Sequence, residues 1–379
     1  MLLALTKFTT RVLRLIGRKI MTNYSDLWVD DGAAESIALR INLPVGSERE
    51  NFKQFVSDGY TILESAVPIE QIDSYLNAIS NLDPMSDEVH VTYGVGQVTT
   101  LKERSISSDN TRVVDSYMFC KEAIDVLFAP AIKSFLETIF QQKACVFQSL
   151  HFNVGSEQAV HQDTAYVVVE QPGNFAAAWI ALEDIKPGSG ELVYYPGSHR
   201  LPHYEYSNNS LHWNRERDGD KLHDQHLKWI HDEARKQKMS LLHFRPKKGD
   251  VLIWHSSLAH GGGVRSDRTL SRQALVGHFF PLGNVPHFAK LIHPQNRAPI
   301  DFMDGAMTSY YYDHSRAMQT LRRQGVVVSR HLKEASFDEK FYLDTNPDVD
   351  QGVKIGQWKS AREHFEIIGR FEGRVPFIS

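Results

Sequence analysis

Short apolar runs dominate the chain between residues 145 and 282, where β-branched and aromatic positions are separated by stretches that contain Gly and Pro. Runs of this kind, bounded by turn residues, are typical of the strands of a sandwich or barrel. We expect strands at 146–152, 159–169, 175–184, 249–255 and 272–279. The pattern therefore predicts a mainly β domain.

Apolar positions at helical spacing lie on both sides of this β-rich region. Helices are expected at about 51–59, 68–79, 120–141 and 300–335, with a strand at 60–63 and a polar loop at 84–116. The predicted fold class is therefore α+β, with a mainly β domain flanked by helices.

Three residues of the β-rich region have the chemistry of a metal site. In a strand, residues i and i+2 point to the same face, so His161 and Asp163 can converge on one ion while Gln162 faces the other way. His260, in the Gly-rich segment after the strand at 249–255, is the candidate third ligand. Two histidines and one carboxylate leave positions open for a chelating cosubstrate and O₂, which is the arrangement of non-haem Fe(II) oxygenases.

A closed structural zinc site is the weaker interpretation of these histidines. Zinc prefers four tetrahedral ligands, often thiolates, and the chain has only Cys120 and Cys145, neither near the histidines in sequence. Arg272 favours the oxygenase interpretation, because a guanidinium can bind a carboxylate bidentately. It could anchor the far carboxylate of a dicarboxylate such as 2-oxoglutarate.

Roughly residues 50 to 290 resemble the phytanoyl-CoA dioxygenase family of Fe(II)/2-oxoglutarate oxygenases, because this region carries a series of sequence motifs in the order that the family has. They are His161-Gln162-Asp163, the run Trp179 to Asp184, the turn Gly188 to Leu192, Pro196-Gly197-Ser198-His199-Arg200, and the segment from His260 through Arg272 to Phe279. The resemblance implies a double-stranded β-helix, which is a cupin-like jelly-roll of two facing sheets with the metal at one open end. It also implies that the polar stretch 203–240 is a variable lid that selects the substrate.

The resemblance implies a role for each candidate site residue. His161, Asp163 and His260 would hold Fe(II), and Arg272 would hold 2-oxoglutarate, with O₂ as the second cosubstrate. Trp179 lies where the family places a tryptophan beside 2-oxoglutarate, and Gln162 and Gln148 are also assigned to the cosubstrate site. His278 shares strand parity with Arg272, so it is expected to face the barrel interior as a hydrogen-bond donor.

The ends of the chain differ from this domain. We expect a basic amphipathic helix at 1–22, a dioxygenase-like domain at 45–295, a helical linker at 296–335 and a small helical module at 336–379. The last segment resembles a short module appended to bacterial glycosyltransferases. The helix at 1–22 has three interpretations that the sequence leaves open: it lies on an anionic membrane surface, packs on the domain or a partner, or is a transit peptide.

The composition of the chain excludes some classes of function. A hydrophobic content of 42% and a net charge of −4 over 379 residues predict a globular protein with no electrostatic reason to bind nucleic acid. Two cysteines fit a reducing, cytoplasmic compartment, which includes the inner face of a membrane. We expect an enzyme that hydroxylates a C–H bond of a small-molecule, lipid or glycan-related substrate, with release of succinate and CO₂. The alternatives are a non-catalytic binding module on the same fold and a metal-dependent hydrolase.

Overall fold

The structure is a computed structural model that describes residues 27–30, 38, 41, 43, 45–94, 96–169, 171–284, 298–330 and 339–367. The described chain forms two compact units, which divide between Ser329 and Arg330. The helix expected at 1–22 lies outside the described residues. Within the described ranges, no helix is both long enough and apolar enough to cross a membrane.

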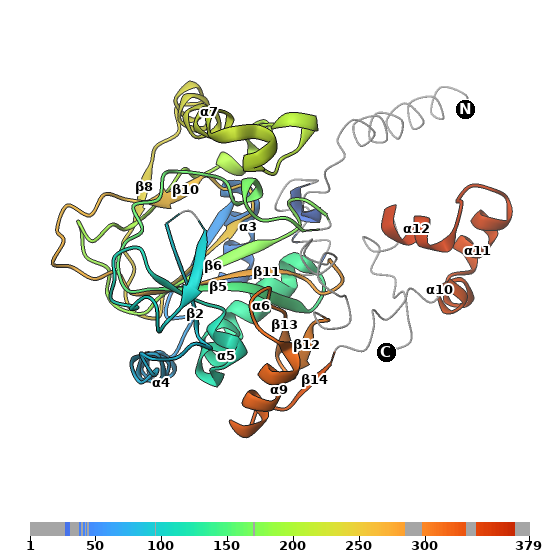
Figure 1. Ribbon diagram of the computed structural model, residues 1–379. Coiled ribbons are helices and arrows are strands. Elements are labelled where there is room, and N and C mark those ends of the chain that lie inside the picture. The colour runs from blue at the N-terminus through green and yellow to red at the C-terminus, as the bar shows by residue number, and fades with distance from the viewer. Residues whose placement is uncertain are drawn as a thin grey trace. The chain divides into compact units, whose positions relative to one another are not determined.

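The first unit contains a large and a small β-sheet (Figure 1). In spatial order, the main path of the large sheet is β1 (Tyr60–Leu63), β9 (Val251–His255), β6 (Ala176–Ala181), β11 (Ala274–Pro281), β5 (Ala144–Phe152), β13 (Gly305–Met307), β12 (Ile300–Phe302) and β14 (Val328–Arg330). A branch from β5 adds β4 (Arg112–Val114), β2 (His90–Tyr93) and β3 (Gln97–Thr100). The small sheet has the order β10 (His260–Gly262), β7 (Leu192–Tyr194) and β8 (Leu242–Phe244).

Alternate residues of the central strands point into the space between the two sheets. Their side chains form one apolar cluster that includes Trp179 and Trp254 of the large sheet with Tyr194 and Phe244 of the small one. This alternation follows from the period of two in a strand. The double-stranded β-helix core with flanking helices is therefore confirmed.

Helices cover the outer face of the large sheet. They are α3 (Ser47–Asp58), α4 (Ile69–Ser80), α5 (Lys121–Leu127) and α6 (Pro130–Phe140), and their apolar faces pack on outward side chains of β6, β9 and β11. Helix α3 ends at Gly59, whose backbone is left-handed at φ 76° and whose N–H donates to Phe55 at 2.9 Å. A Cβ at Gly59 would collide with the imidazole of His199, so glycine suits both the turn and the packing.

Three expectations for secondary structure outside the barrel were wrong. The segment 84–116 is not only a loop, because it contains β2, β3 and β4. The helix expected at 120–141 is two helices, since Pro130 lacks the N–H that a helix interior requires and begins α6 instead. The segment 300–335 contains the β12–β13 hairpin and β14 as well as helix α9 (His314–Arg323), and β13 extends the sheet by pairing with β5 in parallel.

A long polar helix, α7 (Arg215–Lys236), occupies the segment expected to be a lid. Its buried Ile230 packs with Val160, Val193 and Ala259. Helix α7 therefore rests on the residues that directly precede His161 and His260.

The second unit contains three short helices, α10 (Glu339–Thr345), α11 (Pro347–Lys354) and α12 (Ala361–Ile367). They pack around Tyr342, Val349 and Ala361, and the hydroxyl of Tyr342 lies 3.0 Å from Nδ1 of His364. The segment expected to be a helical module is helical where it is described, and its resemblance to a glycosyltransferase appendage stays a prediction.

Candidate metal and cosubstrate site

The three predicted metal ligands lie together in the interior of the protein. His161 and His260 form an antiparallel bridge, with backbone N–H to carbonyl distances of 2.8 and 2.9 Å, which places His161 beside β10. One possible ligand atom from each of His161, Asp163 and His260 lies within 4.8 Å of the others. The Nε2 atoms of His161 and His260 are 3.5 and 3.6 Å from Oδ1 of Asp163.

The local structure that brings the ligands together differs from the expected strand. His161 pairs with His260, but Asp163 begins a short 3-10 helix, Asp163–Ala165. The strand expected at 159–169 was therefore wrong, although the two side chains converge as predicted. Gln162, between the two ligands, has an extended backbone, and the chain turns into the short helix only after it.

Both histidines are oriented by their own backbone. Nδ1 of His161 lies 2.8 Å from the carbonyl of Ala159, and Nδ1 of His260 lies 2.9 Å from the carbonyl of Leu258. A carbonyl can only accept, so each Nδ1 carries the proton and each Nε2 keeps its lone pair towards Asp163. Burial lowers the pKa of His260 to about 4, so its imidazole is neutral at pH 7 and able to bind a metal. This donor set fits Fe(II).

The large sheet positions Asp163 from the opposite side. Nε1 of Trp254 on β9 donates to Oδ2 of Asp163 at 2.8 Å, and Nε2 of His278 on β11 lies 3.4 Å from the same oxygen. Burial alone would raise the pKa of Asp163, but at acidic pH, where His260 is protonated, the charge of that imidazole holds the pKa of Asp163 well below its usual range. The carboxylate is therefore ionised and fixed, and the expectation that His278 faces the interior is confirmed.

Arg272 lies at the far end of the same interior face. Its side chain is 2% exposed, Nη1 donates to the carbonyl of Gly190 at 3.2 Å, and Nε has no hydrogen-bond partner within the described chain. Burial, and then repulsion from Arg112 and Arg265, lower its pKa to about 9. A buried guanidinium with an unpaired N–H fits the distal carboxylate of 2-oxoglutarate.

The path between the metal ligands and Arg272 runs along matched strand positions. In the pairing registers, His278 lies opposite Gln148, Val276 lies opposite Leu150 and Trp179, and Ala274 lies opposite Phe152. Gln148 and Leu150 are only partly buried, whereas their outward-facing neighbours in β5 are buried. This part of the interior face is therefore accessible, as a bound cosubstrate would require.

Two of the predicted cosubstrate residues lie on this path. The guanidinium carbon of Arg272 is 5.7 Å from the ring centre of Trp179, and the buried Nε1 of Trp179 has no hydrogen-bond partner in the described ranges. Gln148 faces the interior at the metal end, in register with His278. Their contacts with 2-oxoglutarate stay predictions.

The role of Gln162 at the cosubstrate site stays a prediction. Its side-chain amide donates to the carbonyl of Ser257 at 2.7 Å, and the residue is 6% exposed. The side chain therefore holds the metal-binding segment against the turn before His260.

Sequence reasoning missed four residues of the site. Arg112 and Arg265 were not singled out, although both repel Arg272, and Arg112 lies 5.1 Å from the ring centre of Phe152. Trp254 was also missed, although its even spacing from Leu252 placed it on the inner face of β9. Tyr166, three residues after Asp163, was the fourth, and the aromatic type so close to a ligand was the available signal.

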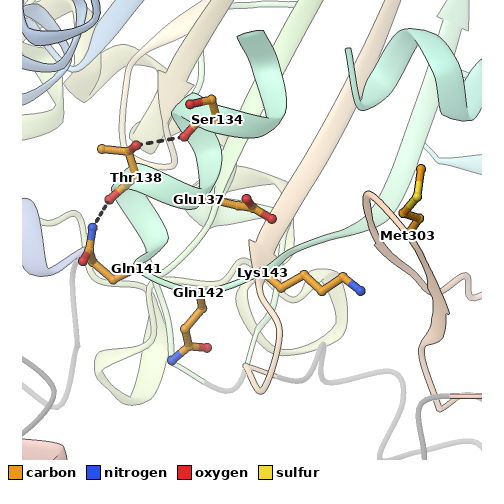
Figure 2. Close-up of a pocket in the computed structure, with 7 residues that line it drawn as sticks. All are labelled: Ser134, Glu137, Thr138, Gln141, Gln142, Lys143 and Met303. Carbon is orange, nitrogen blue, oxygen red and sulfur yellow. Dashed lines mark hydrogen bonds between the residues drawn. The ribbon is translucent and has the colours of Figure 1, made fainter. Parts of the chain in front are cut away.

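A hollow of about 650 Å³ lies elsewhere, at the end of α6 (Figure 2). It is lined by Ser134, Glu137, Thr138, Gln141, Gln142, Lys143 and Met303. Its charged groups are engaged in surface pairs, Glu137 with Lys133 at 2.9 Å and Lys143 with Asp301 at 3.3 Å. The predicted metal ligands do not line it, so it is separate from the site.

Comparison with known proteins relates this site to a family. The family profile described as Phytanoyl-CoA dioxygenase (PhyH) matches residues 55–274. The human protein "Phytanoyl-CoA dioxygenase, peroxisomal" is 23% identical over 241 residues, which cover 61% of this chain and 67% of that protein. The Bos taurus protein "Phytanoyl-CoA dioxygenase domain-containing protein 1" is 41% identical over 58 residues, which cover 15% of this chain and 19% of that protein.

Solved structures with a similar arrangement include two with 2-oxoglutarate present. One is the epimerase SnoN with Fe3+, alpha ketoglutarate and nogalamycin RO, at a TM-score of 0.47 and 17% identity, covering 62% of this chain and 84% of that one. The other is EctD from S. alaskensis with 2-oxoglutarate and 5-hydroxyectoine, at a TM-score of 0.44 and 18% identity, covering 64% and 78%. Because the family profile spans more than half of the chain and includes the clustered ligands, the chain belongs to the phytanoyl-CoA dioxygenase family of non-haem iron, 2-oxoglutarate-dependent oxygenases.

Proposed function

We propose that this chain hydroxylates a C–H bond of a small-molecule, lipid or glycan-related substrate, with release of succinate and CO₂. One observation supports this more than any other. A single interior face has the open three-ligand set at one end and, at the other, the buried guanidinium of Arg272, whose Nε has no hydrogen-bond partner in the described chain. The two ends suit a molecule with a metal-chelating group at one end and a carboxylate at the other.

Each residue of the site has its own role in binding or in orientation. His161, Asp163 and His260 would hold Fe(II), which supplies the activation of O₂ that side chains cannot provide. Arg272 binds the distal carboxylate of 2-oxoglutarate, and Trp179 shields that end from water. Trp254 and His278 keep Asp163 ionised and in place. The carboxylate ligand is present, which favours hydroxylation over halogenation, where chloride would need that position.

The two alternative functions, a non-catalytic binding module and a metal-dependent hydrolase, account for fewer features of the site. A non-catalytic binding module has no physical need for an open metal site combined with a buried arginine whose Nε lacks a partner in the described chain. A metal-dependent hydrolase needs a general base beside the metal. Asp163 is itself one of the possible metal ligands, and Trp254 already donates to its Oδ2, so Asp163 is poorly placed for that role.

An anaerobic titration tests the proposal directly. Fe(II) and 2-oxoglutarate added to the full chain should give a metal-to-ligand charge-transfer band, and admission of O₂ should release succinate. The Asp163→Ala variant should show neither. If the parent gives no band, and the variant behaves like the parent, the proposed site is wrong, and turnover without O₂ or 2-oxoglutarate would favour the hydrolase.

We also propose that the enzyme acts beside an anionic membrane through residues 1–22. In the helix expected from the sequence, Lys7, Arg11, Arg14 and Arg18 would form a basic stripe opposite an apolar one, and each cation near such a surface contributes on the order of 1 kcal/mol. Liposome co-sedimentation of the full chain should exceed that of a chain starting at Asn23, and high salt should abolish the difference. Equal binding of both chains would refute it.

A further inference from the structure

Tyr166 brings a second set of side chains to the metal ligands. Its ring lies 5.3 Å, centre to centre, from the imidazole of His161 at an angle of 70°. Its hydroxyl is 2.6 Å from Nε2 of His223 on α7. Trp213 completes the group, with its ring 4.4 Å from that of His223 and 6.4 Å from that of Tyr166.

This group is open to solvent on one side. Tyr166, Trp213 and His223 are all partly buried, and the side chain of His223 keeps 19% of its surface exposed. In contrast, His161 beside them is buried. The three partly exposed side chains therefore lie next to a buried metal ligand, at positions other than the strand positions that lead to Arg272.

The group is also fixed relative to the ligands. The backbone N–H of Trp213 donates to the carbonyl of Ala165 at 2.9 Å, in the short helix that Asp163 begins. Nε1 of Trp213 donates to the carbonyl of Gly219 at 3.0 Å, where a non-helical φ of 67° interrupts α7. Helix α7 lies on the side of β8 and β10 (Figure 1), and Ile230 anchors it on Val160 and Ala259. These bonds hold Tyr166 and His223 in one arrangement.

The group offers neutral hydrogen-bonding atoms and aromatic faces. Burial lowers the pKa of His223, so its imidazole is uncharged at neutral pH. The two arginines that begin α7 are engaged by aspartates, with Arg215 2.8 Å from Asp220 and Arg217 2.7 Å from Asp218. A phosphate or carboxylate would therefore find no available guanidinium from this turn.

We propose that Tyr166, Trp213 and His223 form a subsite for the primary substrate, and that it binds a hydroxyl-bearing saturated ring such as a pyranose or cyclitol. A ring hydroxyl would exchange hydrogen bonds with the Tyr166–His223 pair, and the C–H face of the ring would pack on the indole of Trp213. Tyr166 and His223 are thus positioning residues for the substrate. The inference rests on the proposed function and specifies its substrate class.

Two measurements test the subsite. In the first, the full chain with Fe(II), 2-oxoglutarate and O₂ receives methyl α-glucopyranoside, methyl α-rhamnopyranoside or myo-inositol, with palmitoyl-CoA and proline as competing classes. At least one ring compound should raise succinate release above the substrate-free rate. In the second, saturation-transfer NMR with Zn(II) in place of Fe(II) measures binding of the same three compounds without turnover.

Two substitutions distinguish an effect on this subsite from an effect on the metal site. Tyr166→Phe keeps the ring and removes the hydroxyl, so it should raise the KM of the stimulating compound roughly 2- to 12-fold, as for one lost neutral hydrogen bond. The charge-transfer band should persist in this variant, because the hydroxyl that it removes binds His223 and not a metal ligand. The matched control is Tyr195→Phe, because Tyr195 forms a similar pair with His231 on the same helix, at 3.1 Å, and this variant should behave like the parent.

The outcomes are distinguishable. A missing charge-transfer band overturns the proposed function, and the NMR experiment still reports on the subsite. With the band present, the subsite proposal fails if no ring compound binds or stimulates, or if only palmitoyl-CoA or proline does. It also fails if Tyr166→Phe and Tyr195→Phe change the KM equally, because a general effect on α7 would then explain both.

Discussion

Strand β5 separates two regions of the barrel that contain polar groups, an outer one beneath the helices and an inner one that faces the small sheet, and the two regions are organised differently. On the outer face, the N–H of Ser149 donates to Asp115 at 2.7 Å, and the hydroxyl of Ser309 donates to the other oxygen of Asp115 at 2.6 Å. Nearby, His151 lies between Tyr75 and Asn153, at 3.3 and 3.0 Å. These groups bind one another and hold the helices and β13 onto the barrel.

On the inner face, key polar atoms lack protein partners. Nε of Arg272 and Nε1 of Trp179 are buried without a hydrogen bond within the described chain, and the two ligand Nε2 atoms point at one carboxylate. Leaving buried donors unpaired costs free energy, so proteins retain such atoms mainly where a ligand will satisfy them. The hydroxyl of Ser149 on the outer face also lacks a partner in the described chain, so the two faces differ in their ionisable groups. Both oxygens of Asp115 accept hydrogen bonds, whereas Arg272 keeps a buried Nε without a partner in that part of the chain. A buried charged group with an unpaired donor therefore marks the binding site.

The largest expected effect on the inner face comes from Asp163→Ala. Removing the only carboxylate of the ligand set should reduce Fe(II) affinity and turnover by more than the roughly 10- to 100-fold typical of changes to residues that merely support ligands. Isothermal titration with Fe(II) under anaerobic conditions, followed by a succinate assay, measures both. Retention of parental Fe(II) affinity would remove Asp163 from the ligand set.

Arg272→Met should have the next largest effect. Loss of a charge-assisted bond to a carboxylate should raise the KM for 2-oxoglutarate roughly 10- to 150-fold, while the Fe(II) affinity stays near that of the parent. The cosubstrate-free protein should not lose thermal stability, because the substitution removes a buried charge whose Nε has no hydrogen-bond partner in the described chain. A large fall in melting temperature with an unchanged KM would assign Arg272 to the structural class instead.

The two interior tryptophans provide a matched pair with a smaller effect. Nε1 of Trp254 donates to Asp163, whereas Nε1 of Trp179 has no partner in the described chain. Trp254→Phe should therefore weaken Fe(II) binding about 10-fold, and Trp179→Phe should leave Fe(II) binding unchanged while raising the KM for 2-oxoglutarate. Equal effects of both substitutions on Fe(II) affinity would show that packing, and not the bond to Asp163, is responsible.

The sequence could predict the ligands because their spacing is local. His161 and Asp163 are two residues apart, and strand parity placed Gln148 and His278 on the inner face, where they are found. The same parity rule failed at Asp163 itself, because the chain turns into a short helix there. The extended backbone at Gln162 was sufficient to bring His161 and Asp163 together.

The missed features depend on contacts between distant segments. Strands β2 to β4 are only three or four residues long, and β4 is defined by its pairing with residues 150–152 of β5. A short polar segment carries no periodic signal of such pairing. Likewise, the amide of Gln162 finds its acceptor 95 residues away, at Ser257, and no local pattern specifies that bond.

The smallest effect on activity is expected from Asp115→Asn on the outer face, where the change should appear in stability instead. Burial raises the pKa of Asp115 from 3.8 to about 7, although hydrogen bonds from Ser309 and Ser149 oppose the rise. Because the folded state holds the proton more tightly than the unfolded state, the contribution of Asp115 to stability is fully present below about pH 4. It is lost as the pH rises to about 7, by about 4 kcal/mol in total.

Asparagine keeps an acceptor for the N–H of Ser149 and tolerates the left-handed backbone of this position, where φ is 49°. The asparagine side chain does not titrate, unlike the carboxyl group of Asp115. Urea unfolding between pH 4 and 8 should therefore show the stability of Asp115→Asn rising relative to the parent across this window, with the charge-transfer band and turnover unchanged. Parallel stability profiles would mean that Asp115 keeps an ordinary pKa in the folded protein. A loss of turnover would mean that the outer face of β5 takes part in the site, and the contrast between the two faces would fail.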